Sequence, residues 1–276
     1  MLNIVKTPTC NSFFNLIKNS KDEVLLCAPY IKKDIVKDIL KFKKPEVKLE
    51  VITSSNIANF INGSLDIGAI KQLIENGCKV LNFQDLHAKI YLFDNEKALI
   101  TSANLTNNGL FHNYEYGVLV ENDKESINRI YADFISMIDS ELCGLFDLKL
   151  ISKIEKLIST FNGKSLVQID SVDDNILPIQ SIQNCTGHLS SWEKDVFECL
   201  DSLKNNEFVL SDVYAFSSIL AKKHPGNNNI SPKIRQMLQH LRDLGLVKFV
   251  KPGFYKKLWV NFPIEHGVEQ YGKNIA

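Results

Sequence analysis

A histidine and a lysine stand two positions apart, at His87 and Lys89, in a segment whose apolar and β-branched residues are typical of a β-strand. Alternate residues of a strand point to the same face, so we expect both side chains on one side of a sheet. Ser102 and Asn104 follow, with Glu115 on the next strand-like run. Histidine is a nucleophile for phosphorus, and ammonium, hydroxyl and carboxamide groups donate hydrogen bonds to phosphoryl oxygens. The pattern predicts an attack on a phosphodiester.

The run from His87 to Asn104 follows the pattern H-x-K-x4-D-x6-(G/T)-S-x-N, which resembles the motif of the phospholipase D superfamily. Thr101 departs from this motif, because the family usually has glycine there. The resemblance implies a covalent phosphohistidine on His87 and chemistry that requires no metal ion or other cofactor. In the roles that it implies, Lys89 and Asn104 bind the phosphate, Ser102 assists them, Glu115 orients the imidazole, and Asp94 has a secondary, structural role.

The chain carries this motif only once. The other histidines, at positions 112, 188, 224, 240 and 266, do not begin an HxK sequence. Phosphoryl transfer needs a nucleophile on one side of phosphorus and an acid on the other to protonate the leaving oxygen. Two copies about a two-fold axis would supply both, and the family's single-motif nucleases resemble that arrangement. We therefore expect a homodimer through the nuclease domain, with one His87 as nucleophile and the other as acid.

Composition is that of a soluble globular protein, with 45% hydrophobic and 23% charged residues. No stretch approaches a membrane span, and the first residues lack the basic and apolar regions of a signal peptide. The cysteines, at positions 10, 27, 78, 143, 185 and 199, show neither CxxC nor Cys/His ligand spacing. We therefore expect reduced, mostly buried thiols in a cytoplasmic protein, with no metal site.

Residues 1–160 alternate between strand and helix patterns, which predicts an α/β domain with a mixed sheet and helices on both faces. The expected strands are 23–28, 46–53, 78–83, 87–93, 98–102 and 114–120. The expected helices are 32–42, 65–76, 123–140 and 148–160. The phospholipase D resemblance implies the same architecture for this nuclease domain.

Residues 161–190 mix Gly, Ser, Asn, Pro and acidic residues without periodicity, and we interpret them as a connector. Residues 191–262 then predict three helices and a hairpin, the order of a winged helix-turn-helix domain. The expected helices are 192–203, 211–223 and one from Ser231-Pro232 to Leu244, and the expected hairpin strands are 246–250 and 254–260.

Positive charge is concentrated in this last domain. Residues 206–260 hold nine Lys and Arg against three Asp and Glu, whereas the whole chain has zero net charge. That asymmetry favours contact with phosphates, and Arg and Gln on the third helix are suited to bidentate base contacts. The candidate DNA-binding residues are Lys233, Arg235, Gln236, Gln239, His240 and Arg242 on that helix, Lys251, Lys256 and Lys257 on the wing, and Asn228 and Asn229 in the loop before it. A protein-binding winged helix is the alternative.

Residues 208–259 also resemble the C-terminal winged helix of the methyladenine-directed, Dam-replacing type of restriction endonuclease. The runs at 233–236 (KIRQ) and 241–245 (LRDLG) carry most of that resemblance. In that family the winged helix accompanies a metal-dependent nuclease core, from which the first domain of this chain departs.

Together these features predict a restriction-type endonuclease that cleaves double-stranded DNA without metal and selects its site through the winged helix. A cognate methyltransferase is an expected partner if unmodified DNA is the target. The sequence leaves open whether adenine methylation is required or blocks cleavage. Two alternatives remain: a lipid phosphodiesterase, which the basic winged helix and the lack of a membrane segment disfavour, and a non-catalytic DNA-binding regulator, which the intact motif disfavours.

Overall fold

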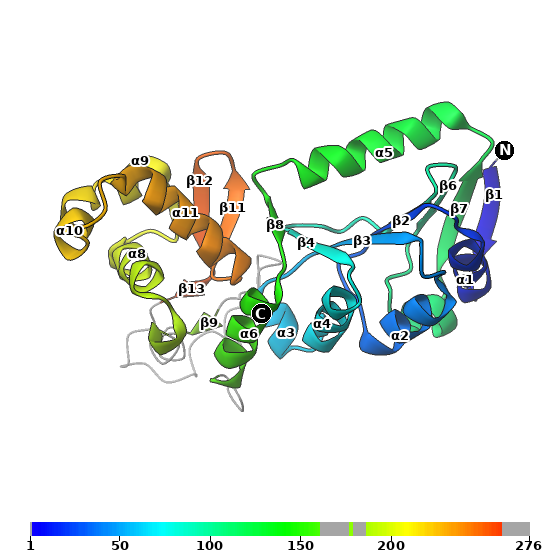
Figure 1. The fold of residues 1–276 in the computed structure, drawn as a ribbon, viewed down its shortest axis with the longest axis horizontal. Coiled ribbons are helices and arrows are strands. Elements are labelled where there is room, and N and C mark those ends of the chain that lie inside the picture. Colours follow the sequence, from blue (N-terminus) through cyan, green and yellow to red (C-terminus); the bar gives the residue numbers. More distant parts are fainter. Residues whose placement is uncertain (1, 161–176, 179–185, 261–276) are drawn as a thin grey trace, which may run out of the picture.

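The computed structural model describes residues 2–160, 177–178 and 186–260. An eight-stranded mixed sheet forms the centre of the first part of the chain (Figure 1), in the order β1-β7-β6-β5-β2-β3-β4-β8. β2, β3 and β4 are parallel to one another, and every other pairing in this sheet is antiparallel. The strands are β1 (Leu2–Lys6), β2 (Glu23–Cys27), β3 (Lys48–Thr53), β4 (Lys79–Phe83), β5 (Ile90–Phe93), β6 (Lys97–Thr101), β7 (Tyr116–Glu121) and β8 (Cys143–Leu145).

Helices cover both faces of this sheet, as the sequence predicts. One face packs against α5, whose Ile127 and Phe134 are buried against Leu25, Leu92 and other residues of the central strands. The opposite face packs against the remaining helices through a larger cluster that includes Phe13. These helices are α1 (Cys10–Asn19), α2 (Lys33–Phe42), α3 (Ile57–Ile61), α4 (Ile67–Glu75) and α6 (Leu148–Ser159), whereas α5 spans Lys124–Ile138.

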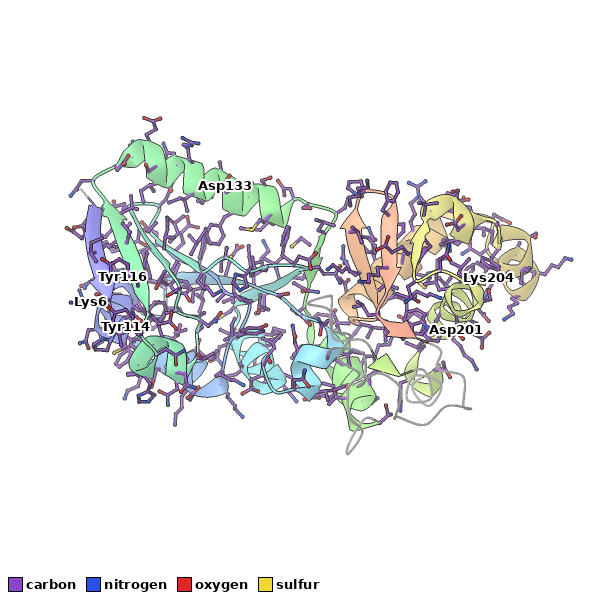
Figure 2. All side chains as sticks on the ribbon, turned by 180° about the vertical axis from the view of Figure 1, so that it is seen from behind. Lys6, Tyr114, Tyr116, Asp133, Asp201 and Lys204 are labelled. Atoms are coloured by element: carbon purple, nitrogen blue, oxygen red, sulfur yellow. The ribbon has the colours of Figure 1, made fainter. Side chains whose placement is uncertain are left out.

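One part of the sheet near β1 and β7 lies outside the cover of α5. Ile4 pairs with Val118, and Val118 pairs with Ile100, so the three share one face. Ile4 is 58% exposed and Ile100 is 40% exposed. Figure 2 shows Tyr114 and Tyr116 beside Lys6 at this same edge of the molecule. The α5 face therefore presents apolar surface at the end of the sheet that holds β1.

The C-terminal part is the expected winged helix. Ser190 caps α8 in a capping box with Glu193, which fixes where the first helix starts. The helices are α8 (Ser191–Ser202), α9 (Leu210–Tyr214), α10 (Ser217–Lys223) and α11 (Ile230–Asp243). β10 (Glu207–Val209), β12 (Phe254–Lys257) and β11 (Val247–Lys251) form a three-stranded sheet in that order. The short strands β9 (Leu177–Pro178) and β13 (Trp259–Val260) pair in parallel.

Some expected boundaries differ from the structure. The helix expected over 211–223 is two helices, α9 and α10, separated at Ala215 and Phe216. Helix α11 begins after Asn229 and not after Ser231, and Pro232 then occupies its first turn, where a missing N–H costs nothing. Most of the connector expected over 161–190 lies outside the described residues. None of the described helices is long and apolar enough to cross a bilayer.

Candidate active site and DNA-binding surface

His87 lies in the loop that joins β4 to β5, and its side chain is exposed. The strand expected over 87–93 begins three residues later, at Ile90. The loop still continues the ladder at its far end, because the Thr101 N–H donates to the Lys89 carbonyl at 3.1 Å. His87 is therefore free of the sheet, while Lys89 is fixed against β6.

Lys89 is 9% exposed, and its Nζ donates to the His87 carbonyl oxygen at 2.8 Å. Burial lowers the pKa of Lys89, and the nearby Glu115 carboxylate and Cys27 act in the opposite direction. A largely desolvated ammonium next to the His87 backbone is a strong point charge for an anionic ligand. This geometry fits the expected phosphate-binding role.

Ser102 and Glu115 meet where β6 ends and β7 begins. The Ser102 hydroxyl donates to Glu115 Oε2, and the Ser102 N–H donates to the Tyr116 carbonyl at 3.0 Å. Asn113 Nδ2 donates to Glu115 Oε1 at 3.2 Å. Within a single chain Glu115 therefore holds Ser102 and Asn113, and its expected contact with the imidazole of His87 is not made.

Asn104 follows on a turn that is held tightly from two sides. Tyr91 Oη donates to the Ala103 carbonyl at 2.7 Å, and a Cβ on Gly109 would lie 2.6 Å from the Asn104 carbonyl oxygen. Only glycine allows that approach. Asn104 Oδ1 is buried and has no hydrogen-bond partner within the described part of the chain. Turning the amide over would place its NH₂ group at this unbonded position.

Thr101 stands where the phospholipase D motif usually has glycine. Gly117, on the neighbouring strand, leaves space for the Thr101 side chain. The two residues face each other across β6 and β7, and a Cβ on Gly117 would lie 2.9 Å from the Thr101 Cβ. Thr101 Oγ1 also accepts from the Ala103 N–H at 3.2 Å. Threonine at position 101 is therefore compatible with the turn that carries Ser102 and Asn104.

Asp94 lies at the opposite end of β5 from Lys89. Its carboxylate accepts from the backbone N–H groups of Lys21, Asp22 and Glu23 at 2.8–3.1 Å, and its φ is +53°. Asp94 therefore anchors the chain as it enters β2, and it does not contact the other motif residues. These contacts agree with the secondary, structural role expected for Asp94 and give it no part in catalysis.

The winged helix leaves most of the expected DNA-binding residues accessible. Arg235, Gln236, Gln239, Lys251, Asn228 and Asn229 are exposed, whereas Lys233, His240 and Lys256 are half-buried. Arg235 Nε donates to Tyr214 Oη at 2.6 Å, and Lys233 Nζ donates to Gln236 Oε1 at 2.7 Å. These local bonds position the outer surface of α11.

Arg242 and Lys257 do not fit the expected DNA-binding role. Arg242 is 4% exposed and bonds to the Glu141 carbonyl and to Asp243, so it fastens α11 to the first part of the chain. Lys257 is 3% exposed, and its Nζ donates to the Leu203 carbonyl at 2.7 Å. The sequence held a signal for Arg242, because it is four residues after Leu238 and shares its buried helical face.

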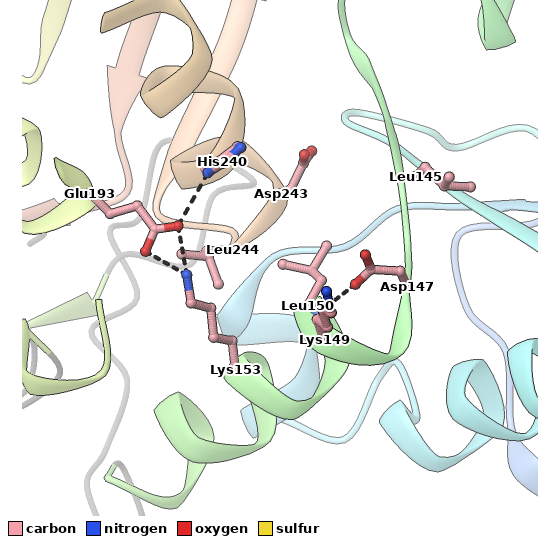
Figure 3. Close-up of a pocket in the computed structure, with 9 residues that line it drawn as sticks. All are labelled: Leu145, Asp147, Lys149, Leu150, Lys153, Glu193, His240, Asp243 and Leu244. Carbon is pink, nitrogen blue, oxygen red and sulfur yellow. Dashed lines mark hydrogen bonds and ion pairs between the residues drawn. The ribbon is translucent and has the colours of Figure 1, made fainter. Parts of the chain in front are cut away.

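His240 belongs to a second contact between the two parts of the chain (Figure 3). Its Nδ1 lies 3.2 Å from Glu193 Oε1, and Lys153 Nζ of α6 donates to the same carboxylate at 2.5 and 2.6 Å. These groups, together with Ser190, hold the pKa of Glu193 well below its usual value against the opposing effect of burial. A pocket of about 350 Å³ opens beside them between α6, α8 and α11.

The described cysteines, at positions 10, 27, 78, 143 and 199, are free thiols; Cys185 lies outside the described residues. Among residues 2–160, 177–178 and 186–260, no three or more His, Cys, Asp or Glu side chains gather where they could hold a metal ion.

Comparison with known families matches the chain in two places. Residues 13–138 match the model described as "Cardiolipin synthase, PLD-like domain", and residues 189–257 match the "Dam-replacing HTH domain". Both matches confirm the resemblances that the motifs predicted. They also agree with the mixed sheet and the winged helix described above.

Individual relatives match smaller or more distant parts. The DISARM protein DrmC of Bacillus paralicheniformis is 48% identical over 42 residues, which are 15% of this chain and 18% of that protein. The chain thus spans under a fifth of this curated relative. Among solved structures, Nuc of Salmonella typhimurium, a phospholipase D family member, is 16% identical and covers 53% of this chain and 97% of its own, with a TM-score of 0.46. NucT of Helicobacter pylori is 20% identical and covers 53% and 99%, also with a TM-score of 0.46.

Proposed function

We propose that this chain, in which a phospholipase D-like domain is joined to a Dam-replacing helix-turn-helix domain, is a restriction-type DNA endonuclease. The winged helix selects the site on double-stranded DNA, and the first domain hydrolyses the phosphodiester. It works in the cytoplasm without a metal ion, beside a cognate methyltransferase if unmodified DNA is its target. The observation that carries this proposal is the convergence of Lys89, Ser102 and Glu115 with the exposed His87 loop at one end of three neighbouring strands.

The proposed reaction has two steps. A ring nitrogen of His87 forms a bond to phosphorus while the bond from phosphorus to the leaving oxygen breaks, and an opposing histidine gives that oxygen a proton. A water molecule then passes a proton back to the opposing histidine and attacks phosphorus, and the N–P bond breaks to restore His87. Lys89, Ser102 and Asn104 hold the charged phosphoryl oxygens in both steps.

The opposing histidine is His87 of a second copy. The motif occurs once in this chain, and in this proposal the two sites face each other across a two-fold axis. Apolar surface close to the site supports such an interface. Tyr116, which is 53% exposed, directly follows Glu115 and lies beside Lys6 (Figure 2). Ile4 and Ile100 flank Val118, two residues further along the same strand. A contiguous exposed apolar patch is typical of a protein–protein interface.

Cleavage is expected to survive removal of divalent cations. The test is digestion of adenine-methylated and unmethylated plasmids in EDTA, followed by sequencing of the ends. We expect defined ends in EDTA from one of the two plasmids, and that plasmid shows whether methylation is required or blocks cleavage. Complete loss of cleavage in EDTA, with recovery on adding magnesium, would overturn the mechanism.

Substitutions on the winged helix should separate base reading from backbone binding. Arg235→Ala or Gln236→Ala should weaken binding to the preferred sequence by about 1–3 kcal/mol and relax the choice of site, because each removes a side chain suited to base edges. Lys251→Ala at the exposed wing tip should weaken binding to all sequences and reduce the salt dependence. Equilibrium binding to specific and unrelated duplexes at several salt concentrations distinguishes the two effects. Equal losses on both duplexes for Arg235→Ala would remove α11 from base reading.

A further inference from the structure

The loop that carries His87 is bonded directly to the wing. Gln84 is the first residue after β4, and its side chain is 6% exposed. Gln84 Nε2 donates to the Val247 carbonyl at 3.0 Å, and the Phe249 N–H donates to Gln84 Oε1 at 2.7 Å. Both groups lie on the edge of β11 that faces away from β12. The side-chain amide of Gln84 thus makes the two hydrogen bonds that a peptide group of a neighbouring strand would make with this edge of β11.

Two contacts beside Gln84 reinforce this junction. Lys248 Nζ lies 2.7 Å from Asp85 Oδ1, so the residue between Val247 and Phe249 holds the residue after Gln84. The turn before β11 packs against the start of α3. A Cβ on Gly245 would lie 2.6 Å from the backbone nitrogen of Ile57. The wing therefore packs against the carboxyl ends of strands β3 and β4.

The path from this junction to His87 is short and restrained. Asp85 has a φ of +60°, so the chain turns sharply at this residue. The side chain of Leu86, which is 7% exposed, is buried in the core under α5. His87 comes next, and the Lys89 carbonyl is bonded to β6. The exposed His87 is thus held between two fixed points, one of which belongs to the winged helix.

We propose that Gln84 is a positioning residue for His87, through which the winged helix holds the nucleophile loop in its cleaving position. This inference rests on the proposed function, because it gives Gln84 an effect on the reaction of His87. It makes the seating of the DNA-reading domain a condition of rapid cleavage. A loop released from β11 leaves the His87 ring misplaced relative to Lys89 and Ser102, and misplacement by about 1 Å costs about a hundredfold in rate.

The test uses the full-length protein with Gln84→Leu, which keeps the size of the side chain but removes both hydrogen bonds. We expect kcat for DNA cleavage to fall by about tenfold to a hundredfold, with less than a twofold change in the dissociation constant for the same duplex. Hydrolysis of bis(4-nitrophenyl) phosphate, a small diester that the winged helix does not need to read, should fall by a similar factor. The imidazole proton resonance of His87 should shift in the NMR spectrum, assigned by its loss in His87→Ala.

Gln84→Glu supplies a second readout. A carboxylate accepts from the Phe249 N–H but opposes the Val247 carbonyl, whereas a carboxylic acid restores the donor. Relative to wild type, this variant should therefore recover kcat as the pH falls through the pKa of the introduced acid. A side chain that only stabilised the fold would change the thermal midpoint without this pH dependence.

A matched control weakens a different contact between the same two parts of the chain. Lys153→Gln weakens the ion pair between Lys153 of α6 and Glu193 of α8. Neither residue belongs to the loop that carries His87. It should lower stability yet leave kcat for the small diester unchanged. A Gln84→Leu protein that is folded and retains wild-type kcat and the wild-type His87 resonance would overturn the inference. A wild-type protein that hydrolyses neither DNA nor the diester would instead overturn the proposed function, and the His87 resonance would still report whether Gln84 positions the loop.

Discussion

Replacing His87 with alanine is expected to abolish DNA cleavage, with a loss of several orders of magnitude in rate. The substitution removes the atom that would attack phosphorus and the acid that would protonate the leaving oxygen. Because the His87 side chain is exposed and lies outside the sheet, its loss should leave the fold and the affinity for DNA nearly unchanged. Single-turnover cleavage, circular dichroism and duplex binding of the same preparation would measure the three quantities.

His188→Ala is the matched control, because His188 is another exposed histidine that lies away from the motif. It should cut at the wild-type rate. If His87→Ala also cut at a rate near wild type, His87 could not be the nucleophile, and the covalent mechanism would have to be abandoned. Trapping of a phosphorylated protein by acid quench, present in wild type and missing from His87→Ala, would identify the intermediate directly.

A mixed dimer of wild-type and His87→Ala subunits is expected to be almost inactive, because each proposed site takes one histidine from each subunit. In an equal mixture after subunit exchange, about a quarter of the dimers carry two intact subunits. Activity should therefore follow the square of the wild-type fraction. The measurement is the cleavage rate over a series of mixing ratios at fixed total protein.

A linear dependence on the wild-type fraction would show that each subunit acts alone. The same series with His188→Ala in place of His87→Ala should stay flat, which controls for damage during exchange. Sedimentation of the wild-type protein gives the independent measure of its oligomeric state.

Most strands and helices of the first domain could be predicted because they depend on local patterns. Buried parallel strands such as β2 and β3 read as short apolar runs, and Gly77, with a φ of +75°, closes α4 where the sequence places a glycine. Four elements, β1, α1, α3 and β8, were not predicted. β1 and β8 are short or half-exposed, so neither carries a clear periodicity.

The candidate site could be predicted as a set of residues, but not in its internal contacts. Spacing alone places Lys89, Ser102 and Asn104 at neighbouring strand ends. The partner of Glu115 depends instead on how β6 and β7 align, and that register brings it to Ser102. Asp94 shows the same limit, since its bonds to residues 21–23 join segments about seventy residues apart.

The sequence by itself determined which chemistry is proposed for this protein, through one histidine motif suited to phosphoryl transfer and one basic winged helix, because residue type and local spacing are properties of the chain. The tertiary structure alone decided which charged residues remain available and how the two parts meet. Arg242 is buried where α11 meets Glu141 of the first part of the chain, and Lys257 is buried inside the winged helix against the Leu203 carbonyl. The bonds from Gln84 to Val247 and Phe249 cross 163 and 165 residues, and no local pattern marks a glutamine whose partner is the edge of a distant strand. Such contacts depend on docked surfaces, which exist only once both parts have folded.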